Sequence, residues 1–172
     1  MREELKTYDW HVCNLSKSDI EYIVRTVDQI IKDRKTLLDD EISQIYKDDP
    51  ESADDIWDDL SYYKNLECFY LWEFLIIRII GIFEGIIERH FLPQAKYRGY
   101  NHRIKALKEN NYALKNEGEI SEWVNLRNAL AHSPTEQYRP IFIDKSDIDD
   151  LCKTLFDSID DLYSQRSAGK SV

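Results

Sequence analysis

The chain has 172 residues, of which 42% are hydrophobic and 33% charged, with only five glycines and four prolines. A single domain of this size buries a sizeable core without staples, and this composition suits a helical protein. The formal net charge of −10 argues against unspecific adhesion to nucleic acid, and widely spaced cysteines without a C-x-x-C pair or a secretory leader favour reduced thiols in the cytoplasm.

The first predicted element is one long helix over residues 18–48. Ser18-Asp19-Ile20-Glu21 has the pattern of a capping box, and apolar residues then recur at helical spacing until Asp49-Pro50. Such a helix is roughly 45 Å long, which is typical of a rod in a helical bundle. Residues 1–17 mix apolar and polar side chains without a clear period, so we expect a docked N-terminal arm there.

A second long helix is predicted from about residue 52 to residue 93, with a break near 58–61. Its centre, residues 68–87, is strongly apolar but contains three charges, Glu73, Arg78 and Glu84. Each charge would cost about 2.5 to 3.5 kcal/mol at the centre of a bilayer, which argues against a membrane span. On a helical projection the charges share one half and the other half is apolar, so the pattern predicts the core helix of a soluble bundle.

Charge is concentrated in two opposite blocks of the sequence. Residues 39–59 contain ten acidic side chains and one lysine, whereas residues 89–108 contain six basic side chains and no acidic one. Tyrosines and histidines are interleaved with the basic residues, a mixture that can hold phosphates and stack on unpaired bases. Two interpretations stay open: a solvated loop and helix face, or an RNA-binding segment that uses Lys96, Arg98, Tyr100, Arg103 and Lys105.

Another short helix is expected over about 101–110, and it is followed by an Asn-rich turn region. The next helix, 121–134, carries a polar stripe on one side: Ser121, Asn125, Asn128 and His132. Because Asn128 and His132 are i and i+4, the amide can hold one ring nitrogen and leave the other free for proton transfer. Arg127 lies about 140° around the axis from His132, so it must reach around, or the turn before Pro134 must unwind.

The last helix is predicted over residues 146–163, after an extended connector at 138–143. Residues 164–172 are small and polar, and we expect them to be disordered. The whole pattern predicts an all-α antiparallel bundle of four or five helices over 18–163. The four histidines lack the short spacings of metal ligands, so we expect neither a metal site nor a cofactor.

Residues Arg127-Asn128-Ala129-Leu130-Ala131-His132 resemble the signature of HEPN (higher eukaryotes and prokaryotes nucleotide-binding) domains. The helical pattern agrees with such a domain over roughly residues 18 to 165. The resemblance implies a small, typically dimeric helical bundle whose active members cut RNA without a metal, with Arg127, His132 and Asn128 at the catalytic site. HEPN toxins paired with a minimal nucleotidyltransferase often carry a tyrosine two residues after the histidine. Pro134 stands there instead, which puts control by adenylylation in doubt.

The sequence therefore predicts a cytoplasmic, homodimeric endoribonuclease of the HEPN type, a toxin or phage-defence component with a possible antitoxin or nucleotidyltransferase partner. In the predicted reaction the ribose 2′-OH attacks its phosphate, His132 moves a proton and Arg127 neutralises charge on the phosphoryl oxygens. Two alternative functions stay open: a HEPN-like module that binds nucleotide or protein without cutting, and a helical scaffold protein with an acidic interaction face. A purely structural interpretation of the motif also stays open, in which His132 is an ordinary helix C-terminal histidine and Arg127 pairs with a carboxylate such as Glu73 or Glu84.

Overall fold

The computed structural model describes residues 16–92, 99–132 and 143–169, and all of its regular elements there are helices. In chain order they are α1 (Lys17–Asp48), α2 (Ala53–Ile86), the π-helical segment η1 (Ile87–Phe91), α3 (Tyr100–Glu109), α4 (Glu117–His132) and α5 (Lys145–Gly169). The prediction of an all-α bundle is confirmed. The connector expected at 138–143 lies outside the described residues except for Ile143, which is buried, and the expected arm lies outside them up to residue 15.

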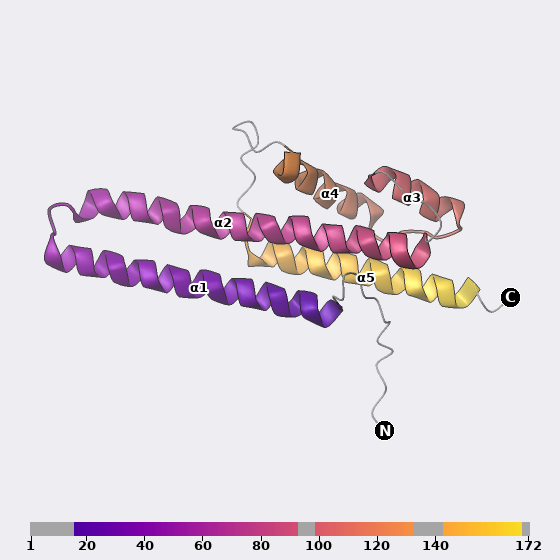
Figure 1. The fold of residues 1–172 in the computed structure, drawn as a ribbon, viewed down its shortest axis with the longest axis horizontal. Helices are drawn as coiled ribbons and strands as arrows, with labels where there is room; N and C mark the ends of the chain where they lie inside the picture. The colour runs from indigo at the N-terminus through magenta and orange to yellow at the C-terminus, as the bar shows by residue number, and fades with distance from the viewer. Residues whose placement is uncertain (1–15, 93–98, 133–142, 170–172) are drawn as a thin grey trace, which may run out of the picture.

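Helices α1 and α2 form a long antiparallel hairpin whose tip extends beyond the rest of the molecule (Figure 1). The capping box at the start of α1 is shifted from the predicted one, because the Asp19 carboxylate accepts a hydrogen bond of 2.8 Å from the backbone N–H of Ser16. At the other end, α1 stops before Pro50, as predicted. The break expected near 58–61 is absent. The helical geometry changes instead at η1, just before Pro93.

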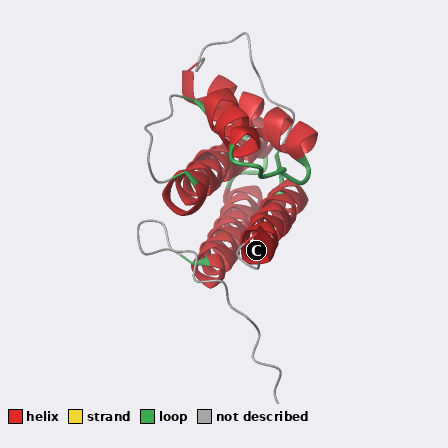
Figure 2. Cartoon of the chain, turned by 90° about the vertical axis from the view of Figure 1, so that its right-hand side faces the viewer, coloured by secondary structure: helices red, strands yellow, loops and turns green. Residues whose placement is uncertain are grey.

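The second half of α2 is the central rod of the bundle. It contacts α1 and α5 on one side and α4 on the other (Figures 1 and 2). Four of its side chains have almost no exposure, Ile76, Ile80, Phe83 and Ile86, and α5 packs on them with an equally buried apolar face. The core helix predicted for residues 68–87 therefore has its apolar half in the core. Among the described residues, no helix combines the length and apolar character that a bilayer crossing requires.

Helix α5 continues to Gly169, so the disorder expected from residue 164 onward is wrong for residues 164–169. The reason lies in two side chains of the last turns. The Gln165 amide donates to the carbonyl of Ala113 at 2.7 Å and accepts from its N–H at 2.9 Å. Arg166 donates to the carbonyl of His90 at 3.1 Å. These bonds to distant backbone groups stabilise a helix end whose own sequence gives little apolar signal.

The turn between α3 and α4 determines how these two helices lie on α2. Asn111 and Asn116 have φ values of 62° and 58°, a left-handed conformation that asparagine tolerates better than most residues. The hydroxyl of Ser158 on α5 donates to the carbonyl of Lys115 at 2.8 Å, which ties the end of the turn to the bundle. As a result α3 and α4 lie together as a layer over α2 (Figure 1).

Candidate functional site

The polar stripe predicted on α4 faces away from the bundle core. Asn125, Asn128 and His132 are exposed, whereas Ile120 and Val124 are buried. The helix stays regular through His132, so the last turn does not unwind within the described residues. No hydrogen bond joins Asn128 to His132 in the structure, and the imidazole stands exposed at the C-terminal end of α4.

Arg127 points to the other side of α4 and pairs with a carboxylate on α2. Its Nη2 donates to Oε1 of Glu84 at 2.7 Å, and the two side chains are only 19% and 10% exposed. The Nε atom of Arg127 is buried and has no hydrogen-bond partner among the described residues. The structure therefore shows Arg127 in an ion pair with Glu84, one of the two carboxylates named above as its possible structural partners. The guanidinium is therefore not free on the face that carries His132.

Arg103 belongs to the same buried charge network. It donates to Oε2 of Glu88 from Nε at 3.2 Å and from Nη2 at 2.9 Å, and its Nη1 lies 3.7 Å from Glu84. Two arginines and two glutamates thus join α3, α4, α2 and η1 with balanced charge. Arg103, predicted to bind RNA, is turned inward and positions α3. Glu84 is one of the two carboxylates that the sequence suggested as a structural partner of Arg127, whereas the partner role of Glu88 on η1 was not predicted.

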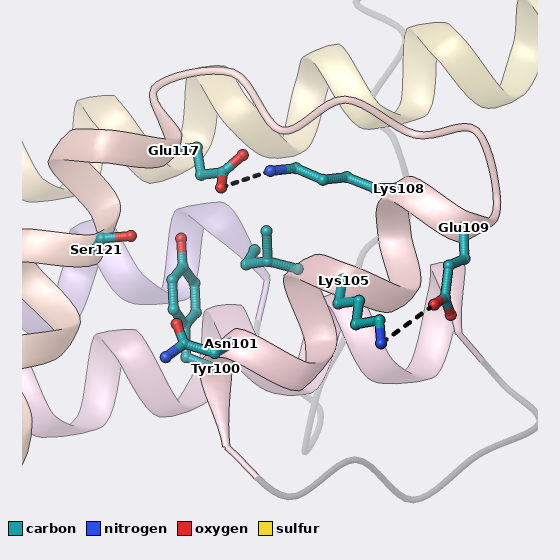
Figure 3. Close-up of a pocket in the computed structure, with 8 residues that line it drawn as sticks. Tyr100, Asn101, Lys105, Lys108, Glu109, Glu117 and Ser121 are labelled. Carbon is teal, nitrogen blue, oxygen red and sulfur yellow. Dashed lines mark hydrogen bonds and ion pairs between the residues drawn. The ribbon is translucent and has the colours of Figure 1, made fainter.

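A cleft runs between α3 and α4, and it consists of two adjoining hollows that share Tyr100, Asn101 and Ser121. The larger hollow, of about 580 Å³, is also bounded by Ile104, Lys105 and Lys108 (Figure 3). At its mouth Lys108 pairs with Glu117 at 2.8 Å, and Lys105 lies 3.8 Å from Glu109. The basic side chains of this hollow therefore already have acidic neighbours.

The smaller hollow, of about 340 Å³, joins the polar stripe of α4 to the start of α3. Asn125 and Asn128 line it from α4, and Asn101 and His102 line it from α3. Helix α3 begins directly after Gly99, whose φ of 82° is accessible chiefly to glycine. Two groups that the sequence separates, the amide stripe and the first residues of the basic segment, are thus brought together.

Tyr100 stands between the two hollows. The residue is only 7% exposed, and its hydroxyl is buried without a hydrogen-bond partner among the described residues. Burial raises the pKa of Tyr100 to about 12; the nearby Ser121 hydroxyl acts in the opposite direction, and the charges of Glu117 and Glu84 add to the rise. Figure 3 shows the phenol directed toward Ser121 and Glu117. At neutral pH the phenol is uncharged and can donate or accept a hydrogen bond.

Lys96 and Arg98, the other two residues predicted to bind RNA, lie outside the described residues. Among the residues that the structure describes, no cluster of histidine, cysteine or carboxylate side chains has the arrangement of a metal site. Comparison with protein-family models, with curated proteins and with solved structures finds no match to this chain.

Proposed function

We propose that the chain is a metal-independent endoribonuclease of the HEPN type that binds RNA along the polar stripe of α4. The supporting observation is the continuity of that stripe. Ser121, Asn125 and Asn128 line the cleft, and His132 is exposed on the same side. Four helical residues rise about 6 Å, so His132 lies one turn beyond the last cleft residue. A strand held in the cleft would pass the imidazole of His132, a side chain that can act as a general acid or base.

In the proposed reaction the ribose 2′-OH attacks the neighbouring phosphate and the 5′-oxygen leaves. His132 transfers a proton, and the Asn128 amide donates to the phosphoryl oxygens, leaving a 2′,3′-cyclic phosphate and a 5′-hydroxyl. Because Arg127 is paired with Glu84, we assign it a positioning role: it fixes α4 on α2 and so sets the direction of the stripe. This assignment differs from the role in charge neutralisation that the sequence pattern predicts.

The direct test is cleavage of single-stranded RNA in EDTA. His132→Ala should lower the rate by on the order of 100-fold or more, the usual effect of removing a general acid or base. Glu122→Ala is the matched control, since Glu122 is exposed on α4 but lies off the stripe, and it should cleave normally. Substrates with 2′-deoxyribose should stay intact. Equal rates for His132→Ala and wild type, or an absolute need for Mg²⁺ or Mn²⁺, would reject the mechanism.

The reaction needs a second proton carrier, and we propose that a second copy of the chain supplies it as a homodimer. Helix α4 runs antiparallel to α2, and the C-terminal end of α4 lies near the middle of α2 (Figure 1). On α2 the apolar side chain of Phe74 is 76% exposed, and a Cβ placed at Gly81 would meet no atom within 4 Å. Phe74→Glu should shift the protein to monomers and reduce cleavage, as measured by light scattering at micromolar concentration. A wild-type monomer with full activity would contradict the dimer.

A second candidate function is binding of nucleotide or protein without cleavage, and the Arg127–Glu84 pair favours it. Because Glu84 already neutralises the charge of Arg127, this side chain contributes little to stabilising the negative charge that develops on the phosphoryl oxygens during cleavage. RNA that binds but is never cut would support this candidate. For the biological setting we propose a toxin or phage-defence component, by analogy with the HEPN family. An adjacent gene for an antitoxin or a small nucleotidyltransferase would be the simplest support.

A further inference from the structure

The α3–α4 cleft is bordered by a hydroxyl that meets no hydrogen-bond partner at the usual distance and angle among the described residues. The hydroxyl of Tyr100 is buried, belongs to a side chain that is only 7% exposed, and lines both hollows. Buried polar groups in folded proteins are nearly always hydrogen-bonded, because an unpaired one costs its full desolvation penalty. Because the hydroxyl itself has almost no accessible surface, a ligand in the cleft supplies the missing partner only by displacing the side chain beside it, that of Ser121.

The chemistry of the smaller hollow narrows the class of ligand. Its polar lining consists of three amides, Asn101, Asn125 and Asn128, the Ser121 hydroxyl and the imidazole of His102, and none of the described residues that line it is a carboxylate. Val124 and the ring of Tyr100 add apolar surface. Each amide offers both donors and an acceptor, so the lining suits a neutral ligand with alternating donors and acceptors on its edge.

The charges that line the larger hollow argue against a free phosphate as the main ligand. Lys108 is paired with Glu117 at 2.8 Å, and Glu109 and Glu117 both line the hollow, so an anion would meet two carboxylates there. A flat, uncharged heterocycle with polar edges avoids that repulsion. An unstacked nucleobase has this chemistry, and proteins read such bases through hydrogen bonds at the edge and contacts with aromatic side chains.

We propose that the α3–α4 cleft is a base-binding subsite that takes one unpaired nucleobase of a single strand, with the Tyr100 hydroxyl and the α4 amides on its edge. This inference rests on the proposed function and names the part of the substrate that the cleft recognises. With the base held at Asn125 and Asn128, the backbone of the strand passes toward His132. The cleft then selects the position at which the strand is cut.

The test measures equilibrium binding of fluorescein-labelled DNA hexamers, each made of a single base, and of a hexamer of abasic sites. DNA lacks the attacking hydroxyl, so cleavage cannot interfere with the measurement. Wild type should prefer one base by about tenfold or more over the others and should bind the abasic strand weakly. Tyr100→Phe and Asn125→Ala should each reduce that preference by about tenfold, the size expected when one or two hydrogen bonds are lost.

Tyr100→Phe also separates a binding role from a structural one. Removing an unpaired buried hydroxyl should leave the melting temperature unchanged or raise it, while binding of the preferred base weakens. Tyr112→Phe is the matched control, because Tyr112 follows α3 but does not line the cleft, and it should bind all hexamers as wild type does.

Three results would overturn the subsite. The first is equal affinity for all four bases and the abasic strand, and the second is an unchanged base preference in Tyr100→Phe and Asn125→Ala. The third is equal affinity for a mononucleotide and a hexamer, because a subsite for one base of a strand should bind the hexamer more tightly. Failure of the ribonuclease is distinguishable from these results. Base preference on DNA together with intact RNA would retain the subsite and reject the nuclease, whereas His132-dependent cleavage without base preference would do the reverse.

Discussion

The two halves of α2 share one helix but differ in what covers them. Near the hairpin tip α1 is the one described helix that lies alongside, and large apolar side chains remain exposed there, Ile56 at 36% and Trp57 at 45%. The second half of α2 is covered by α1, α4 and α5, and even the carboxylate of Glu84 is buried there. The helices that cover each half, together with the face of α2 on which a side chain lies, therefore decide whether it contributes to the core or to the surface, since Phe74 is 76% exposed within the well-covered half.

The largest difference between the halves should appear when an aromatic side chain is removed from each. Phe83→Ala creates a cavity among fully buried neighbours and should cost about 3 to 5 kcal/mol of unfolding free energy. Trp57→Ala removes a half-exposed side chain and should cost less than about 1 kcal/mol. Urea denaturation followed by circular dichroism measures both. Similar losses of unfolding free energy in the two variants would show that another molecule covers the hairpin tip.

An ion pair in each half provides the next comparison. Arg127→Ala leaves the buried Glu84 with the more distant Arg103 as its described cationic neighbour and should cost about 3 kcal/mol or more. Lys64→Ala breaks a pair whose carboxylate, on Asp39, is 62% exposed, and it should cost about 1 kcal/mol or less. The double variant Glu84→Gln/Arg127→Met removes both charges together and should recover most of the loss. If the double variant also cleaves RNA, Arg127 is a positioning residue. If the double variant is folded but inactive, Arg127 has the catalytic role that was predicted from the sequence.

The elements of the fold were predictable because their signals are local. Apolar periodicity, Pro50 and the Asn-rich turn lie within the segments that they define, and the structure has the helices there. The end of α5 was missed because Gln165 and Arg166 bond to backbone groups more than fifty residues away in sequence. The polar stripe of α4 was likewise predictable from spacing. The cleft was not, since it depends on how α3 is placed by the pairing of Arg103 with Glu88.

Two tyrosines provide the finest comparison, because the pKa of each is raised for a different reason. Burial raises the pKa of Tyr100 to about 12 in the bundle. At the hairpin tip Tyr46 is exposed, and its pKa is raised mainly by the hydrogen bond of 2.7 Å that its hydroxyl donates to Asp54, with smaller contributions from burial and from the charges of Asp54 and Asp58. Asp54→Asn should therefore lower the Tyr46 pKa and leave Tyr100 unchanged, and Asp58→Asn should have a smaller effect.

Because the pKa of Tyr100 is raised more than that of Tyr46, Tyr100 should make the larger contribution of the two to the change in stability at high pH. Unfolded tyrosine loses its proton near pH 10, whereas folded Tyr100 keeps it until about pH 12, so the unfolded state binds fewer protons between these values and stability falls as pH rises. The loss should approach about 2 kcal/mol by pH 12, and Tyr100→Phe should remove it. Urea denaturation at several pH values above 9 measures the loss. Tyr46→Phe is the comparison: the pKa of Tyr46 is raised as well, but by less, so this variant should have a smaller effect on the loss. If Tyr100→Phe leaves the alkaline loss unchanged, the Tyr100 hydroxyl is in contact with solvent, and the buried, unpaired group on which the base-binding subsite depends does not exist in solution.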